Sequence, residues 1–341
     1  MANKIKGKVR LAIVGAGGIS GAHAKGIVEH HDLIECVALC DVSEDNLKAR
    51  SQQLGGVKAQ FSDWKTMLKE FGDSIDAVDI CLPHHLHSAA IMDAAAAGKH
   101  ILCEKPMCIS LKEADQIAAA VKKAGITYMS AHNQLFAPAV REAKALIDAG
   151  ALGRVWWIRS LDCYRQNPQG MKGRWRSNAK LQGGGELIDS GYHPSYRLLY
   201  LAGSPVTGIR GSMARFHMEI EGEDTASVQV RFKNGVLGEI MTSWAFHFPY
   251  GTHHIHVIGE NGQLFGSNNE LYYLPQGYSE PAKRSFPGVD TFSEQMKHFA
   301  TCLIEGKRPI HSVEEGRAVL ELILAAGEDA KGWEKTAQKR P

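Results

Sequence analysis

The chain has 341 residues, which is more than one average domain holds, so two domains are expected. Its residues are 44% hydrophobic and 22% charged, as in an ordinary globular protein. The formal net charge is only +2 and the Lys and Arg residues are scattered, which argues against nucleic acid or a membrane surface as partner. No apolar run reaches the roughly 18 residues that a membrane-spanning helix needs.

The cysteines bear on redox compartment and metal binding. There are seven, an odd number, and no Cys-x-x-Cys pair occurs, which disfavours a structural zinc site. Most lie in apolar, strand-like runs, where a thiol behaves as a small hydrophobic group. A reducing, cytoplasmic location is the natural expectation.

In the first 130 residues, apolar runs alternate with helical patterns. Strands are expected over Val9–Val14, Ile34–Cys40, Ala77–Leu82, His100–Cys103 and Thr127–Ala131. Helices are expected over Ile19–Glu29, Ser43–Leu54, Trp64–Phe71, Ser88–Ala97 and Leu111–Ala124, the last opened by a capping box of Ser110 and Glu113. This alternation predicts a doubly wound parallel sheet, an α/β fold of the Rossmann kind.

The turn after the first strand carries a dinucleotide-binding pattern. It runs through Gly15, Gly17, Gly18, Ile19 and Ser20, so that Ser20 stands at the third glycine position. Gly15 would permit the tight turn, and Gly17 would let the backbone approach a pyrophosphate at the helix N-terminus.

Asp41, at the end of the next strand, fits the position that binds the adenosine ribose hydroxyls. A carboxylate there would repel a 2′-phosphate and no Arg follows at once, so NAD is expected rather than NADP. The alternative is that Asp41 only caps the next helix.

The segment after the Ala77–Leu82 run contains three histidines in four positions, beginning Leu82-Pro83-His84 and ending at His87. Ligands bind at this edge of an open α/β sheet. No carboxylate or Cys stands nearby with ligand spacing, so a metal site is not expected. We expect these residues to cap the following helix and to line the nicotinamide side.

Glu104-Lys105-Pro106 follows the strand-like run His100–Cys103. Burying a charged side chain without a partner costs several kcal/mol, so such a pair indicates either a salt bridge or a site.

The pattern changes after Asn133. A helix is expected over Pro138–Ala149, followed by strands over Val155–Leu161, Val206–Ala214, Thr225–Phe232, Val236–Phe246 and His254–Gly259. Asn234-Gly235 is a strong hairpin signal. The second half is therefore expected to be an α+β domain with an antiparallel sheet.

A second chemical motif runs from Gly183 to Pro194 and contains Asp189 and His193, four residues apart. On a helix both side chains would share one face, close enough for a carboxylate to orient an imidazole. Proline is tolerated only in the first turn of a helix. Because of Pro194, the helix is therefore expected to start near Ser190, with Asp189 just before it. The alternative is a helix-capping Asp and a packed His.

Tyr164, Arg174 and Trp175, with Arg165 and Arg176, precede this motif and could reach a substrate. An aromatic face with guanidinium donors suits a sugar. The alternative is an ordinary polar surface loop.

Taken together, the glycine turn, Asp41, Pro83 with His87, the Ala97–Pro106 stretch and the Asp189/His193 motif resemble the Gfo/Idh/MocA oxidoreductase family. The resemblance spans essentially the whole chain. It implies an NAD-binding domain over 1–132 and a substrate-binding domain over 133–341, whose large open sheet builds a homodimer or homotetramer. It also implies Lys105, Asp189 and His193 as catalytic residues. From the chemistry of the loop described above, we expect Tyr164, Arg174 and Trp175 to contact the substrate together with these three. The implied cofactor-binding residues are Gly15, Gly17, Gly18, Ile19, Ser20, Asp41, Leu82, Pro83, His84, His87, Glu104, Lys105 and Asn133.

Two departures from many relatives leave the substrate open. Gln134, Leu135 and Phe136 stand where an Arg is common, and Tyr196 stands where an acid is common.

The resulting hypothesis is an NAD-dependent dehydrogenase of a sugar, inositol or related polyol. His193 would act as base, Asp189 would hold it, Lys105 would donate to the reacting hydroxyl, and Glu104 would fix Lys105 or the cofactor. The alternatives are redox-assisted glycoside hydrolysis or elimination, and a non-catalytic NAD-binding regulator. The presence of Lys105, Asp189 and His193 favours an enzyme.

Overall fold

The structure is a computed structural model that describes residues 4–249 and 252–337. The chain divides into two compact units, Met1–Asn133 with Asp290–Arg317, and Gln134–Val289 with Ala318–Pro341. The sequence-based boundary between 132 and 133 differs from this by the return of 290–317 to the first unit. The sequence could not predict this return, because the residues of a helix do not show which of two sheets the helix packs against.

The first unit contains a six-stranded sheet of parallel strands. Its order is β3 (Ala59–Phe61), β2 (Ile34–Cys40), β1 (Val9–Val14), β4 (Ala77–Ile80), β5 (His100–Glu104) and β6 (Tyr128–Ala131). This confirms the doubly wound fold. The short, half-exposed β3 was not predicted, because it offers no apolar run.

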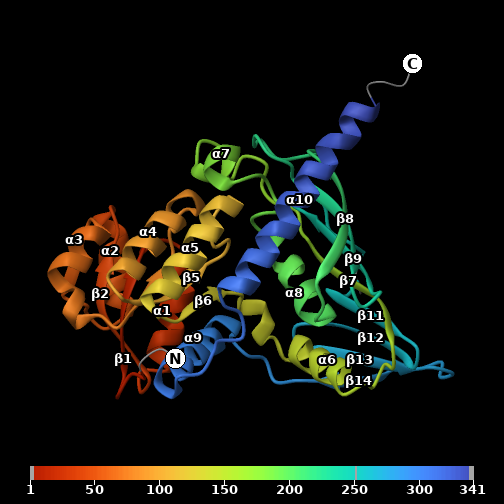
Figure 1. Ribbon diagram of the computed structural model, residues 1–341, viewed down its shortest axis with the longest axis horizontal. Coiled ribbons are helices and arrows are strands. Elements are labelled where there is room, and N and C mark those ends of the chain that lie inside the picture. Colours follow the sequence, from red (N-terminus) through yellow and green to blue (C-terminus); the bar gives the residue numbers. More distant parts are fainter. Residues whose placement is uncertain (1–3, 250–251, 338–341) are drawn as a thin grey trace. The chain divides into compact units, whose positions relative to one another are not determined.

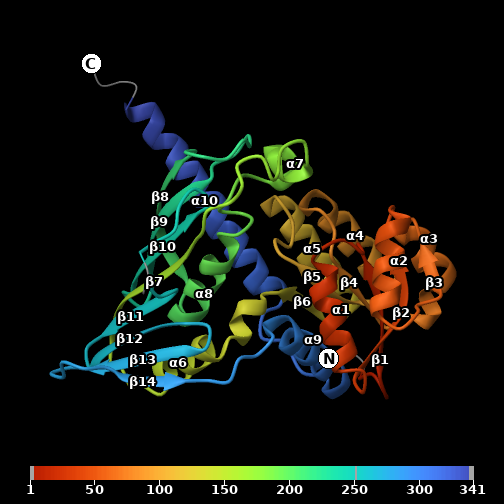
Figure 2. The same ribbon diagram turned by 180° about the vertical axis from the view of Figure 1, so that it is seen from behind.

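Two layers of helices cover this sheet (Figures 1 and 2). One layer holds α1 (Ser20–Glu29), α2 (Glu44–Gln53) and α9 (Thr291–Glu305), and the other holds α3 (Trp64–Phe71), α4 (His84–Ala96) and α5 (Leu111–Ala124). The 3₁₀ turns η1 (Gly72–Ser74) and η2 (Asn133–Phe136) link elements. The expectation that α4 starts at Ser88 was wrong, because Pro83 ends the strand connection and the histidines form the first helical turn.

The order of the strands shows at which edge of the sheet a ligand is expected to bind. β1 pairs with β2 on one side and with β4 on the other, so the chain direction across the sheet reverses at β1. Open α/β sheets bind ligands outside the carboxyl ends of strands at such a switch point.

The second unit contains an eight-stranded open sheet. Its order is β14 (Ala282–Ser285), β13 (Glu270–Pro275), β12 (Gly262–Ser267), β11 (Ile255–Gly259), β7 (Val155–Cys163), β10 (Leu237–Ser243), β9 (Thr225–Phe232) and β8 (Val206–Ala214). All neighbours are antiparallel except the parallel pair β10 and β7. The predicted β9–β10 hairpin is present, with Gly235 at a φ of 87° in its turn.

Helices cover one face of this sheet, namely α6 (Pro138–Asp148), α8 (Tyr192–Ala202) and the long α10 (Val313–Ala337) (Figure 1). The short elements η3 (Trp175–Ser177) and α7 (Ala179–Gln182) lie in the loop before α8. Gly211 of β8 lies directly against the backbone of Ala326 in α10, where a Cβ would come within 2.2 Å of the Ala326 carbonyl oxygen.

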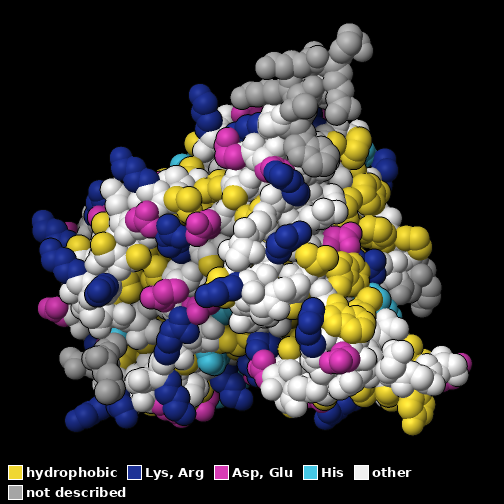
Figure 3. Space-filling view, turned by 45° about the vertical axis from the view of Figure 1, so that its right-hand side comes forward, with side chains coloured by type: hydrophobic (Ala, Val, Ile, Leu, Met, Phe, Trp, Pro, Cys, Tyr) yellow, Lys and Arg dark blue, Asp and Glu magenta, His cyan; other side chains and the backbone are white. Residues whose placement is uncertain are grey.

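A band of aromatic side chains crosses neighbouring strands of this sheet. Trp157, His256, Phe265 and Tyr272 form a row in which adjacent ring centroids lie 5.2–5.8 Å apart. All four keep part of their surface exposed. Hydrophobic side chains gather toward the right of the face seen in Figure 3. All seven cysteines are free thiols. Within the described residues, no helix is both long and apolar enough to cross a membrane.

Candidate active site

The turn between β1 and α1 requires glycine at its first position. Gly15 has a φ of +97°, and a Cβ there would lie 2.6 Å from the carbonyl oxygen of Cys81. The backbone of β1 therefore passes the end of β4 at a distance that an L side chain would prevent.

The next glycines leave open space above the turn. A Cβ at Gly17 or Gly18 would meet nothing within 4 Å. The first turn of α1 carries no acidic residue and no side-chain cap, and its Gly21 and Ala22 N–H groups donate to the Gly18 and Ile19 carbonyls. An anion here would face the positive end of the helix. Open space before an uncapped helix N-terminus fits the pyrophosphate of a dinucleotide.

Arg50 of α2 forms hydrogen bonds to this turn, a contact that was not predicted from the sequence. Its Nε donates to Ser20 Oγ at 2.9 Å and its Nη2 donates to the Gly17 carbonyl at 3.0 Å. Ser20 Oγ in turn donates to the same carbonyl at 2.7 Å. Burial lowers the pKa of Arg50, which nonetheless stays a cation at neutral pH.

Asp41 lies beside the same turn. Its carboxylate accepts from the Ala16 N–H at 2.7 Å, from the Ser43 N–H at 2.8 Å and from Asn46 Nδ2 at 3.2 Å. The N-cap of α2 is Ser43 and not Asp41, so capping does not account for this carboxylate. Its place next to the glycine turn fits ribose binding.

Glu104 is buried, with 6% of its surface exposed, and a salt bridge explains it. Its Oε1 lies 2.9 Å from Nε2 of His23, and its Oε2 accepts the backbone N–H of Lys105 at 3.1 Å. The Lys105–Pro106 peptide bond is cis. Both carboxylate oxygens of Glu104 thus have partners where β5 ends.

In the histidine segment, His87 contacts backbone carbonyl groups. His87 is fully buried, and its ring nitrogens lie 2.6 Å from the Pro106 carbonyl oxygen and 2.7 Å from the Leu82 carbonyl oxygen. Burial lowers the pKa of His87. The His84 ring lies beside it at a tilt of 56°, with the two ring centroids 5.9 Å apart. A role for either ring at the nicotinamide stays a prediction.

Asn133 is the last residue of the N-terminal segment of the first unit. It is buried, and its Nδ2 donates to Thr291 Oγ1 at 2.9 Å. Its proposed contact with the cofactor stays a prediction.

Four of the six residues predicted to bind substrate line one cavity in the second unit, whereas Lys105 and His193 are not among its lining residues. A cavity of about 440 Å³ is lined by Tyr164, Arg174, Trp175 and Asp189. The remaining lining residues are Gln166, Asn167, Gly170, Met171, Arg176, Ser190 and Trp244. The loop before the glycine triplet thus contributes to a cavity and is more than an irregular surface loop.

Asp189 lies in this cavity with a charged partner. Its Oδ2 accepts from Arg176 Nε at 2.7 Å and from Gln182 Nε2 at 3.4 Å. Only 6% of its side chain is exposed. The Arg176 guanidinium lies over the Trp175 ring, 4.2 Å from the ring centroid, which orients that indole.

His193 occupies the first turn of α8, which begins at Tyr192, two residues after the expected start. Pro194 falls in this turn and Asp189 falls before it, both as predicted. The Nδ1 of His193 lies 2.7 Å from the Tyr196 hydroxyl. Asp189 was the only partner predicted for this imidazole, and the spacing of Tyr196, three residues after His193, was the available signal.

Gln134, one of the departures from many relatives, supports α8. Its backbone N–H donates to the Tyr196 hydroxyl at 3.1 Å, and its Oε1 accepts from Arg197 Nη1 at 2.7 Å. Arg197 is 1% exposed and also donates to the Leu161 carbonyl. The residues before α6 therefore fix the helix that carries His193.

A hydrogen-bonded triangle forms the floor of the cavity. Tyr164 Oη and Ser190 Oγ lie 2.7 Å apart, and Trp244 Nε1 donates to both, at 3.1 and 2.9 Å. Trp244 is 1% exposed and packs on Met218 and Ile220. The hydroxyl groups of Tyr164 and Ser190 are thus held in place.

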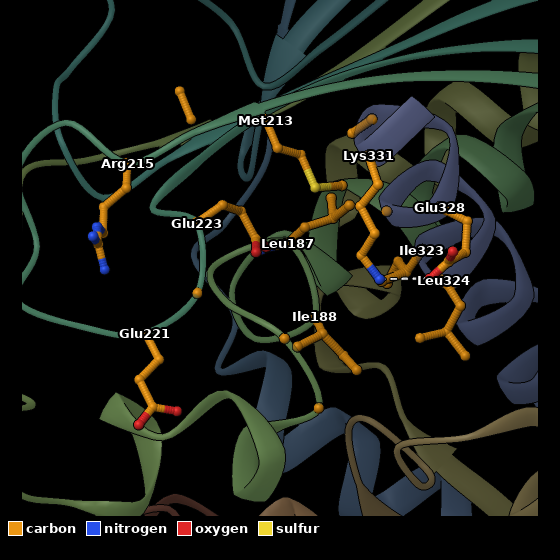
Figure 4. A pocket seen from close by; sticks show the side chains of 16 residues that line it. Leu187, Ile188, Met213, Arg215, Glu221, Glu223, Ile323, Leu324, Glu328 and Lys331 are labelled. Atoms are coloured by element: carbon orange, nitrogen blue, oxygen red, sulfur yellow. Dashed lines mark hydrogen bonds and ion pairs between the residues drawn. The ribbon is translucent and has the colours of Figure 1, made fainter. Parts of the chain in front are cut away.

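A second cavity of about 460 Å³ lies behind the glycine triplet (Figure 4). Leu187, Ile188 and the side chains of Ile323 and Leu324 from α10 line it, and Lys331 pairs with Glu328 at 2.6 Å. None of the predicted site residues is among the described residues that line this cavity. The cavity containing Asp189 is therefore the better candidate site.

Residues 9–132 match the family model described as "Oxidoreductase family, NAD-binding Rossmann fold", and residues 140–265 match the "GFO/IDH/MocA C-terminal domain". Scyllo-inositol 2-dehydrogenase (NAD(+)) from Bacillus subtilis is 29% identical and covers 94% of this chain and 93% of its own. Myo-inositol 2-dehydrogenase from Thermotoga maritima is 26% identical, covering 93% and 95%.

The crystal structure of aldose-aldose oxidoreductase from Caulobacter crescentus superposes with a TM-score of 0.84 at 25% identity, covering 95% of this chain and 98% of its own. The two halves of the chain thus match two models of one family, over residues 9–132 and 140–265. The chain belongs to the Gfo/Idh/MocA oxidoreductases, NAD(P)-dependent enzymes with an NAD-binding Rossmann fold.

Proposed function

We propose that this protein oxidises a secondary hydroxyl of a sugar, inositol or related polyol, with NAD as acceptor. The observation that carries the proposal is the lining of the cavity at Asp189, where hydroxyl, amide and guanidinium groups surround an indole. Polyols offer alternating hydroxyl groups and C–H faces, which suit such a lining. The inositol 2-dehydrogenases among the relatives support this substrate class.

Bound NAD would supply the hydride acceptor, and the protein would remove the hydroxyl proton. His193 is the proposed base. If its Nδ1–H donates to the Tyr196 oxygen, which also accepts from the Gln134 N–H, the proton-accepting lone pair lies on Nε2. This tautomer suits general-base catalysis near neutral pH.

Asp189 has a different role in this scheme. Its carboxylate is held by Arg176, so it stays ionised and can accept a hydrogen bond from a substrate hydroxyl. A charge held next to the reacting alcohol would also stabilise the imidazolium that forms on His193.

Lys105 is the proposed electrophilic group. Its ammonium would donate to the substrate oxygen and stabilise alkoxide character as hydride leaves. The Glu104 carboxylate accepts the backbone N–H of Lys105, which fixes the backbone from which this side chain extends.

A panel of inositols, aldoses and glycosides with NAD tests the proposal by NADH absorbance and product identification. Steady NADH formation with a polyol supports it. Glycoside cleavage without net NADH would favour the redox-assisted hydrolase, and tight NAD binding without turnover would favour a regulator.

We further propose that the aromatic row on β7, β11, β12 and β13 forms the contact between copies of this chain. Trp157, Phe265 and Tyr272 would bury apolar surface there, as oligomer interfaces do. Sedimentation of the wild type and of Phe265→Glu tests this, since a monomeric wild type would contradict it.

A further inference from the structure

A fully buried imidazole lies behind the glycine turn. His23 of α1 is 0% exposed. Its Nδ1 lies 2.8 Å from Asp79 Oδ2, and its Nε2 lies 2.9 Å from Glu104 Oε1. Because Asp79 belongs to β4 and Glu104 ends β5, this ring joins the nucleotide-binding helix to two strands of the sheet.

The geometry fixes the protonation of this group. An ionised carboxylate only accepts hydrogen bonds, and a neutral imidazole would turn one lone pair toward such an oxygen. Contacts from both nitrogens therefore favour an imidazolium between two carboxylates. Burial lowers the pKa of His23, but Asp79 outweighs it and holds that pKa well above its ordinary value.

The other groups around the ring are compatible with this. Cys81 Sγ lies 3.7 Å from Nδ1 of His23 and 3.7 Å from Asp79 Oδ1, and the Phe292 ring lies 5.7 Å from the imidazole between centroids. Burial raises the pKa of Cys81 to about 12, so it is a neutral thiol. The ligand atoms of His23, Asp79 and Cys81 lie within 4.8 Å of one another, but both ring nitrogens already have carboxylate partners.

Glu104 connects His23 to Lys105 through its two carboxylate oxygens. Glu104 uses Oε1 for His23 and Oε2 for the backbone N–H of Lys105. Beyond Lys105, the Pro106 carbonyl is held by His87 at 2.6 Å. Without the imidazolium, Glu104 would be a buried carboxylate that has lost its closest counter-charge.

We propose that His23 is a positioning residue for Lys105, acting through Glu104. It couples the helix that receives the dinucleotide to the backbone and charge environment of the lysine ammonium. The inference rests on the role of Lys105 in the proposed function, but its physical content is testable without any substrate.

The test measures the reactivity of the Lys105 amine toward limiting acetic anhydride, by peptide mass spectrometry, relative to exposed Lys112. His23→Gln changes the formal charge of the trio His23, Asp79 and Glu104 from −1 to −2, which favours the ammonium. We expect labelling of Lys105 to slow by about threefold or more. The double variant His23→Gln/Glu104→Gln restores −1 and should return the rate to within about twofold of wild type.

His31→Gln, an exposed histidine just beyond α1, is the matched control and should leave the rate unchanged. Unchanged or faster Lys105 labelling in a folded His23→Gln protein would overturn the proposal. If the variants label Lys105 as expected but the wild type oxidises no polyol, the proposed function fails while the positioning role of His23 stands.

Substitution at a fully buried charge can prevent folding, so the wild type supplies a second test. Long-range ¹H–¹⁵N NMR of its 16 histidines should show one imidazolium that persists at about pH 8, above the ordinary histidine range. Absence of such a signal would overturn the proposal without any variant.

Discussion

The hydroxyl oxygen of Tyr196 lies 2.7 Å from Nδ1 of His193, one helical turn apart on α8. This contact places a neutral group where an acid is common in relatives, so the imidazole is oriented without a second negative charge. Tyr196→Phe should lower kcat about 10-fold, since the ring loses the partner that fixes its tautomer. Tyr200→Phe on the same helix is the control for losing a hydroxyl, and equal effects of the two variants would contradict this role.

His193→Ala should lower kcat by about 1,000-fold while NADH binding, followed by fluorescence, stays within about twofold of wild type. The base is lost, but no group proposed to touch the adenosine or phosphates is altered. Near-normal turnover would remove His193 from the mechanism.

Lys105→Met should lower kcat by about 100-fold or more, because the methionine fills the same space without a donor for the developing alkoxide. Lys112→Met, an exposed lysine of the same unit, is the control. An effect confined to KM would mean that Lys105 binds substrate without assisting hydride transfer.

Asp41→Ser should weaken NAD and relieve the repulsion of a 2′-phosphate. We expect the NAD-to-NADP preference, measured as a ratio of kcat/KM values, to fall by about 10-fold or more. Asp45→Ser on the exposed side of α2 should not change it. A wild-type preference for NADP would overturn the assignment of Asp41.

Trp175→Ala should raise KM for the polyol by about 10-fold with a smaller effect on kcat, since stacking on the indole contributes to binding in both the ground and transition states. Trp156→Ala removes an indole that is 48% exposed on β7 and serves as control. Trp175→Phe should restore part of the affinity.

The acid stability of the second unit should depend on Asp224. Burial would raise the pKa of this carboxyl, but the backbone N–H groups of Met218, Phe216 and His217 outweigh it and hold the pKa below its usual value. The stabilisation is therefore complete above the unfolded pKa of about 3.9 and is lost as pH falls through the lower folded pKa.

Asp224→Asn should thus lower the free energy of unfolding by about 3 kcal/mol near pH 7, with the deficit shrinking below about pH 4. Urea unfolding at a series of pH values measures it. Asp148→Asn, with 59% of the side chain exposed, should show no such pH dependence, and a constant deficit at all pH values would contradict the account.

The sequence predicted the buried strands of the first unit well, because β1 and β2 are apolar runs with a single charged residue each, Arg10 and Glu35. It did not predict β12, β13 or β14, where glycine and polar residues break the alternation. Loop residues around Asp189 could be proposed from their chemistry. His23 could not, because its importance arises only when α1, β4 and β5 bring it against Asp79 and Glu104.

The return of α9 to the first unit has a consequence for how the protein is made. A Cβ on Gly26 of α1 would lie 2.9 Å from Met296 Cγ and 2.9 Å from Ser293 Cα, so α1 and α9 are in close contact. The dinucleotide-binding half therefore cannot complete its packing on the ribosome until residues near 300 have left the exit tunnel. A fragment ending near residue 133 should expose the apolar side of α1 and aggregate, whereas adding 290–317 in trans should rescue it.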